Sequence, residues 1–134
     1  MKKIKSTLGL IVNPISGMGG RVGLKGTDTS AIIASAIALG AKPESTIRAT
    51  TCLKEIHSGL HASLDVICPP GIMGEKVAEE AGFSPTVLPM KIPDDTSAKD
   101  TRTAVEMMAN AKVSLILFAG GDGTARGIYL VIKD

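Results

Sequence analysis

Apolar runs of strand length alternate with segments of helix length along the chain, and this alternation limits the folds that the sequence can adopt. The expected strands are apolar without a clean two-residue period, as in parallel strands that helices cover on both faces. The strands are expected at residues 7–12, 45–50, 64–68, 86–88 and 113–118, and the helices at 29–39, 52–62, 74–81, 98–110 and 124–132. This alternation predicts an α/β fold, a three-layer Rossmann-like sandwich around a mainly parallel sheet of about five strands.

Residues at the expected helix ends support these boundaries. Gly40 and Gly82 stand where glycine commonly ends a helix. The spacing of Ser97 and Asp100 predicts a capping box before helix 98–110, with aspartate in place of the usual glutamate. One stripe of that helix is expected to face the core and consists of Thr101, Val105, Met108 and Ala111. The residues expected to face water are Lys99, Arg102 and Glu106.

A chain of 134 residues with 44% hydrophobic and 21% charged residues predicts one globular domain over residues 1–134. The net charge of +2 is too small to indicate binding to nucleic acid or to a membrane surface, and no apolar run is long enough to span a bilayer. The N-terminal segment lacks the small-residue cleavage site of a signal peptide. Cys52 and Cys68 form no C-x-x-C pair and are interpreted as reduced core thiols of a cytoplasmic protein.

The segment "GIYLVI" in the last expected helix is apolar on every side. Such a helix is either enclosed by its own fold or covered by another molecule. A two-fold dimer is the commonest way to cover an apolar patch, so we expect a homo-oligomer.

The loop after the first strand is rich in glycine and carries two cations. It reads "NPISGMGGRVGLKGTD" over residues 13–28 and contains five glycines with Arg21 and Lys25. Glycines let backbone N–H groups turn inward as an anion-binding nest, to which the cations add charge. The loop matches neither the P-loop nor the dinucleotide fingerprint, because Lys25 precedes a glycine and the expected third glycine is Val22. A plain surface loop is the alternative interpretation.

The turn "GGDGT" after the last strand is more specific. Gly120 and Gly121 allow a tight turn, and Gly123 allows the backbone to approach a ligand closely. The helix that follows offers free N–H groups and a positive dipole end to phosphate. Asp122 can therefore be a base that takes a proton from an attacking hydroxyl, a ligand of Mg²⁺, or a plain helix N-cap.

Other chemically capable residues give weaker signals. His57 and His61 are four apart on a helix, but no third metal ligand is evident, and we interpret them as solvated. Asp94 and Asp95 follow a proline and are interpreted as turn residues. The methionines at 73, 107 and 108 are expected to fill the core.

Taken together, "NPISG" and "GGDGT" resemble the NAD kinase/diacylglycerol kinase superfamily. The longer strings "NPISGMGGRVGLKGTD", "PPGIMGE", "DTSAKDT" and "FAGGDGTAR" look most like the ATP-NAD kinase family of archaea and some bacteria. The resemblance spans almost all of the chain but only the amino-terminal half of a family member. It implies transfer of a phosphoryl group from ATP, or a related donor, to the 2′-hydroxyl of NAD, with Mg²⁺.

The resemblance also assigns site residues. Asp122 matches the family's catalytic aspartate, which acts as base or orients the acceptor hydroxyl. The positions that match its nucleotide-binding segments are Asn13, Pro14, Ser16, Gly17, Gly19, Gly20, Arg21, Gly23, Lys25, Gly120, Gly121, Gly123 and Thr124. No dedicated metal ligands are assigned.

The chain differs from the family pattern at two points. Nothing corresponds to the β-rich second domain with its Asn-Glu motif, and Gly127 replaces the usual aspartate after Ala-Arg. We therefore expect the chain alone to form little NADP. The alternatives are a nucleotide-binding fragment without catalysis and a diacylglycerol or other lipid kinase domain.

Overall fold

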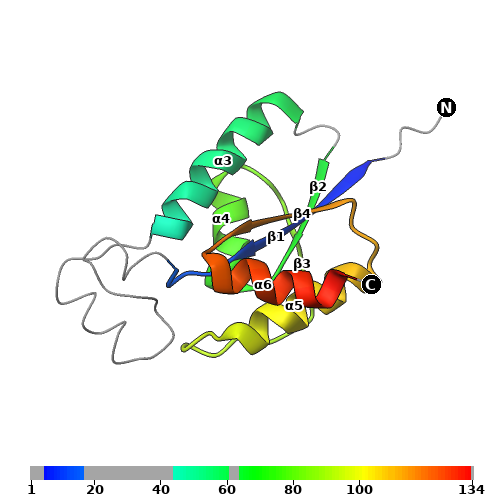
Figure 1. Cartoon of the computed structure of the whole chain (residues 1–134). Coiled ribbons are helices and arrows are strands. Elements are labelled where there is room, and N and C mark those ends of the chain that lie inside the picture. Colours follow the sequence, from blue (N-terminus) through cyan, green and yellow to red (C-terminus); the bar gives the residue numbers. More distant parts are fainter. Residues whose placement is uncertain (1–4, 17–43, 61–63, 134) are drawn as a thin grey trace.

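The computed structural model describes residues 5–16, 44–60 and 64–133 of the chain (Figure 1). The described elements are β1 (Ser6–Val12), α3 (Glu44–Leu60), β2 (Leu64–Cys68), the 3₁₀ turn η2 (Gly71–Met73), α4 (Glu75–Glu80), β3 (Thr86–Val87), α5 (Ala98–Asn110), β4 (Leu115–Ala119) and α6 (Asp122–Ile132). The four strands form one parallel sheet in the order β3-β2-β1-β4. The predicted α/β fold class is therefore confirmed.

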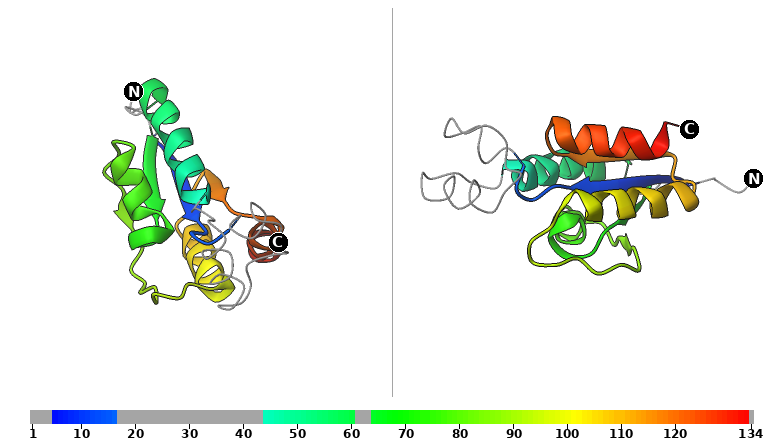
Figure 2. Two further views of the ribbon diagram at one scale, coloured as in Figure 1. Left: turned by 90° about the vertical axis from the view of Figure 1, so that its left-hand side faces the viewer. Right: turned by 60° about the horizontal axis from the view of Figure 1, so that its bottom comes forward.

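Helices cover both faces of this sheet (Figures 1 and 2). They enclose two clusters of buried apolar side chains. The side chains of β1 alternate between the clusters, because successive residues of a strand point to opposite faces. Leu8, Leu10 and Val12 pack with α3 and α4, whereas Ile11 packs with α5 and α6. The centre of the molecule is therefore β1, which is buried on both faces.

Residues 45–50 form the first turns of α3, so the strand predicted there is wrong. The β-branched residues of this segment favoured a strand. Burial instead follows a helical period, since Ser45, Ala49 and Leu53 are buried while Ile47 is exposed. Over residues 52–60, the helix predicted at 52–62 is the second part of α3, and residues 61–62 lie outside the described residues. The helix predicted at 29–39 and the cap at Gly40 lie outside the described residues.

The predicted helix ends around α4 and α5 are confirmed. Gly82 has a φ of 103° and follows α4, where its N–H donates to the carbonyl of Glu79 and that of Phe83 to the carbonyl of Ala78. This is the hydrogen-bond pattern of a Schellman motif, which requires the left-handed backbone that glycine adopts readily. The capping box before α5 is formed, with the Ser97 N–H donating to the Asp100 carboxylate over 2.8 Å.

The buried stripe of α5 is confirmed for three of its four members, since Thr101, Val105 and Met108 are buried. Ala111 is exposed instead, because it caps the helix and lies beyond the last turn that packs on the sheet. The residues expected to face water, Lys99, Arg102 and Glu106, are exposed.

The two cysteines are both free, but they differ in environment. Cys68 is in the core as predicted, and burial together with the nearby Glu75 and Glu79 carboxylates raises the pKa of its thiol to about 12. Cys52 is exposed on α3, so its prediction as a core thiol is wrong. Met73 and Met108 fill the core as predicted, and Met107 packs against the α5–α6 cluster while partly exposed.

Candidate functional site

The segments that follow β1 and β4 leave the sheet side by side. Val12 and Ala119, the last residues of these strands, are register partners, and the Asn13 N–H donates to the Ala119 carbonyl over 2.9 Å. The segment after β2 reaches the same edge, because all described strands are parallel. The described parts of the three loops that follow β1, β2 and β4 therefore meet at one edge of the sheet.

A side-chain hydrogen bond joins the first loop to the glycine turn. Asn13 Nδ2 donates to Thr124 Oγ1 over 3.0 Å, and Asn13 Oδ1 accepts from the Ile15 N–H over 3.3 Å. Thr124 is buried. Both functional groups of the Asn13 side chain are therefore used within the protein, and the Thr124 hydroxyl is held between β1 and α6.

The two glycines before Asp122 are needed for this close packing. A Cβ atom on Gly120 would lie 2.5 Å from Thr124 Oγ1 and 2.7 Å from the Thr124 Cβ, so any other residue would displace the Thr124 side chain. A Cβ on Gly121 would lie 3.3 Å from Ser16 Oγ, which is a tight contact. The position of Gly123 is open, and packing does not explain why glycine occupies it.

Asp122 is the first residue of α6, and the N-cap of this helix is Gly121. The Asp122 side chain makes no cap hydrogen bond, so it is not the plain N-cap considered as an alternative. It is exposed, and it has no hydrogen bond or ion pair with any described residue. A carboxylate without a partner among the described residues therefore stands beside the N–H groups that begin α6, which have no acceptor within the helix.

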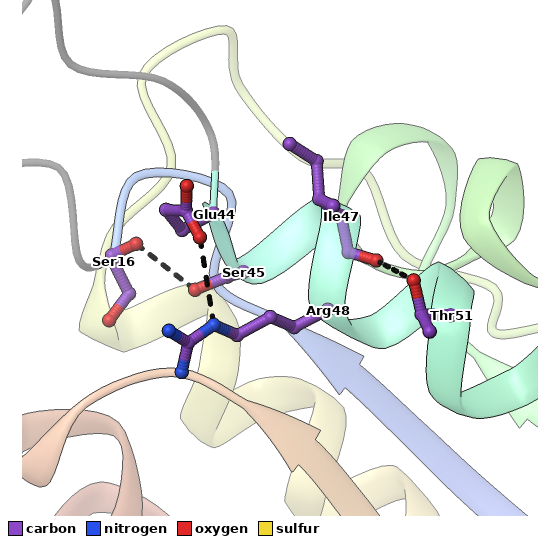
Figure 3. A network of polar contacts seen from close by, with 6 residues as sticks. All are labelled: Ser16, Glu44, Ser45, Ile47, Arg48 and Thr51. Atoms are coloured by element: carbon purple, nitrogen blue, oxygen red, sulfur yellow. Dashed lines mark hydrogen bonds and ion pairs between the residues drawn. The ribbon is translucent and has the colours of Figure 1, made fainter.

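The first turn of α3 completes the site, and the sequence reasoning missed it. Ser45 Oγ donates to the Ser16 carbonyl over 3.0 Å, which fixes the start of α3 against the start of the first loop (Figure 3). One turn further along, Arg48 Nε lies 3.6 Å from the Glu44 carboxylate. Helical spacing over 44–53 was the signal that could have revealed this turn.

An open cleft with a volume of about 550 Å³ lies between α3 and β4. Its apolar wall comes from Leu10, Ala49, Leu117, Phe118 and Ala119, with Cys52 beside them. Its polar part comes from Ser16, Glu44, Ser45 and Arg48, and the glycine turn contributes Gly120 and Gly121. The cleft thus joins an apolar wall to a polar mouth at the carboxyl ends of the strands, where ligands bind in open α/β sheets.

The remaining predicted residues divide into two groups. Pro14 and Ser16 are buried at the start of the first loop, and Ser16 lines the cleft. Those that lie outside the described residues are Gly17, Gly19, Gly20, Arg21, Gly23 and Lys25.

The weaker candidates do not form a site. The His57 ring packs edge-on against Phe83 with 4.9 Å between ring centroids and is half-buried, so its interpretation as a solvated side chain is wrong. His61 lies outside the described residues. Within the described ranges, no three His, Cys, Asp or Glu side chains are grouped to hold a metal ion. Asp94 and Asp95 are exposed in the loop before α5, as expected of turn residues.

No helix in the described part of the chain has the length and apolar character needed to cross a membrane. Comparison with curated proteins gave no match, and comparison with solved structures gave none either. The family model described as the ATP-NAD kinase N-terminal domain matches residues 8–134, which include both loops of the site. The chain therefore belongs to the ATP-NAD kinase N-terminal domain family.

Proposed function

We propose that this domain binds ATP and NAD and contributes to phosphoryl transfer onto the 2′-hydroxyl of NAD, giving NADP and ADP. The observation that carries the proposal is the carboxylate of Asp122, which has no partner among the described residues and directly follows Gly120 and Gly121 in the lining of the α3–β4 cleft. Membership of the NAD kinase family supports the choice of reaction over lipid phosphorylation.

The start of α6 suits a phosphate group. The carbonyl of Gly121 accepts the first intrahelical hydrogen bond, from Ala125, so the N–H groups of residues 122–124 have no partner within the helix. These groups and the positive end of the helix dipole attract anions. The adjoining cleft has the size of small-molecule sites, which is about 300–1,000 Å³, and its apolar wall suits a nucleoside.

Asp122 has the chemistry of the general base in this reaction. Its carboxylate accepts the proton of the 2′-hydroxyl as that oxygen attacks the γ-phosphorus of ATP, while the bond from the γ-phosphorus to the bridging oxygen breaks. Mg²⁺ bound with ATP would neutralise charge on the phosphates, and those phosphates would hold the ion. The Asp122 carboxylate is then left to accept the proton.

Nucleotide binding by the purified chain tests the proposal. We expect calorimetry to detect ATP and NAD, and either ligand to slow the reaction of Cys52 with a thiol reagent, because Cys52 lines the cleft. The buried Cys68 thiol is the internal control and stays unreactive in the folded protein. Absence of binding by both nucleotides at millimolar concentration would refute the proposal.

Catalysis requires a second measurement. We expect the chain alone to form NADP slowly, because the family resemblance implies a β-rich domain that carries much of the NAD site, and acceptor positioning supplies much of the rate. Nucleotide binding with no NADP above the uncatalysed level would favour a binding module.

We place the protein in the cytoplasm, which agrees with its two free thiols.

A further inference from the structure

The polar mouth of the cleft contains a cation that no motif identified. We propose that Arg48 binds the phosphate groups of the nucleotide in the α3–β4 cleft, an inference that rests on the proposed function. Arg48 lines the same cleft as Gly120 and Gly121. The glycine-rich first loop had suggested Arg21 and Lys25 as the phosphate-binding cations, whereas Arg48 comes from a helix on the opposite side of the cleft from β4.

The position of Arg48 is fixed by the protein. It lies one turn into α3, and Ser45 ties that first turn to the Ser16 carbonyl over 3.0 Å. Gly121 in turn packs near Ser16, where a Cβ would lie only 3.3 Å from Ser16 Oγ. Ser16 is therefore the shared support of the helix that carries Arg48 and of the turn that precedes Asp122.

Glu44 orients the guanidinium of Arg48 through its Nε and leaves the Nη groups for a ligand. Its Nε lies 3.6 Å from a Glu44 carboxylate oxygen, and the side chain folds back along α3 toward Glu44 (Figure 3). The Glu44 side chain is 20% exposed and the Arg48 side chain 80% exposed. The Nη groups carry four further N–H donors in the planar arrangement that binds two phosphate oxygens at once.

Charge balance in the cleft favours this role. Among the described residues that line the cleft, Arg48 is the one cation and Glu44 the one anion. Asp122 adds a second carboxylate beside the glycine turn. A phosphate chain placed here would meet two negative side chains and needs a positive one. An exposed helical ion pair contributes little to stability, so the pair itself gives no strong structural reason for Arg48.

The test compares ATP with adenosine in calorimetric titrations of three proteins: the wild type, Arg48→Gln and the control Lys54→Gln. Lys54 is exposed on the same helix but does not line the cleft. Loss of a charge-assisted hydrogen bond weakens binding about tenfold or more, so we expect that loss for ATP in Arg48→Gln. Adenosine affinity should change less than about twofold, and Lys54→Gln should match the wild type.

The outcomes separate the two proposals. If the wild type binds ATP and Arg48→Gln binds it with the same affinity, the role of Arg48 is overturned and the proposed function stands. Equal losses of affinity for ATP and for adenosine would also overturn it, because adenosine has no phosphate group for Arg48 to bind. If the wild type binds neither ATP nor NAD, the proposed function fails and this inference fails with it. The melting temperature of Arg48→Gln should match the wild type, since the residue is exposed.

Discussion

Three neighbouring polar side chains have different tasks at this site. Asn13 and Thr124 were both predicted to bind nucleotide, but their side chains bind one another. Asp122 lies two residues before Thr124 and has no partner among the described residues. The bonded pair therefore holds the turn in place, and the carboxylate remains available for a ligand. This division leads to two predictions.

In a form of the protein that carries the β-rich second domain, Asp122→Asn should lower the rate of NADP formation about 10²–10⁴-fold, the usual cost of losing a general base. Asparagine keeps the shape of the side chain but does not accept the proton. ATP affinity should stay the same or rise, because a negative charge beside the phosphates is removed. Steady-state kinetics and calorimetry on the same preparation give both values. A variant with unchanged kcat would show that Asp122 has no catalytic role.

Thr124→Val and Asn13→Ala should each reduce the free energy of unfolding by about 1–3 kcal/mol, because each leaves a buried or half-buried polar group unpaired. In the double variant the losses should not add, since both remove the same hydrogen bond. Urea unfolding of the four proteins measures the coupling energy. Thr103→Val is the matched control, because the Thr103 hydroxyl bonds only to the carbonyl of Lys99. Additive losses for Asn13 and Thr124 would contradict the link.

The Cys68 thiol gives stability a dependence on alkaline pH. Its pKa is about 12 in the folded protein, above the ordinary value of 9.0, so the unfolded chain loses the thiol proton first as pH rises. The contribution of this thiol to the free energy of unfolding is therefore fully present below pH 9. It is lost as the pH rises toward 12, by at most about 1.4 kcal/mol per pH unit. In urea unfolding at pH 7.5–10.5, the free energy of unfolding should decrease less steeply with pH in Cys68→Ala than in the wild type. Equal slopes would mean that other groups cause the decline.

At the level of elements, α6 contains a glycine with no packing reason. A Cβ on Gly127 meets no atom within 4 Å, and the residue lies in the helix interior. Gly127→Ala should therefore stabilise the protein by about 0.5–1 kcal/mol. Gly82→Ala should do the opposite, because its φ is 103° and its Cβ would lie 3.0 Å from the His57 ring. Thermal unfolding of both variants decides, and a destabilised Gly127→Ala would indicate a contact outside the described residues.

The elements also show where sequence reasoning succeeded and where it could not. The carboxyl ends of β1 and β4 could be placed together from sequence, because parallel strands put their following loops at one edge. The first turns of α3 were missed, because the β-branched residues of "STIRAT" outweighed its helical spacing and its burial depends on packing against β1. Because the start of α3 was not predicted, its side of the cleft and Arg48 were not predicted either.

At the scale of the whole molecule, β4 is one of the two edge strands of the described sheet. In the described part of the chain, β4 has a strand on one side only. Its sequence, "LILFA", has none of the charges or prolines that usually prevent strand addition, and its Leu115 is 65% exposed. The helix that follows exposes Tyr129, Leu130 and Ile132. These residues are the part of the apolar last helix that the fold leaves uncovered, while Ile128 is buried.

We predict that two copies of the chain associate through the outer edge of β4. A two-fold axis would pair the two β4 strands antiparallel, satisfy their outer backbone groups, and bring uncharged side chains together without repulsion. Burial of apolar surface contributes about 25 cal/mol per Å², and the exposed residues of β4 and α6 supply that surface.

Sedimentation at micromolar concentration should show a dimer that Leu115→Lys converts to a monomer, since a charge there opposes pairing of the edges. Ile47→Lys on α3 is the control, because Ile47 is also an exposed apolar residue but lies away from β4, and it should leave the dimer intact. A wild-type chain that sediments as a monomer at all concentrations, or a dimer that tolerates Leu115→Lys but not Ile47→Lys, would exclude association through this edge.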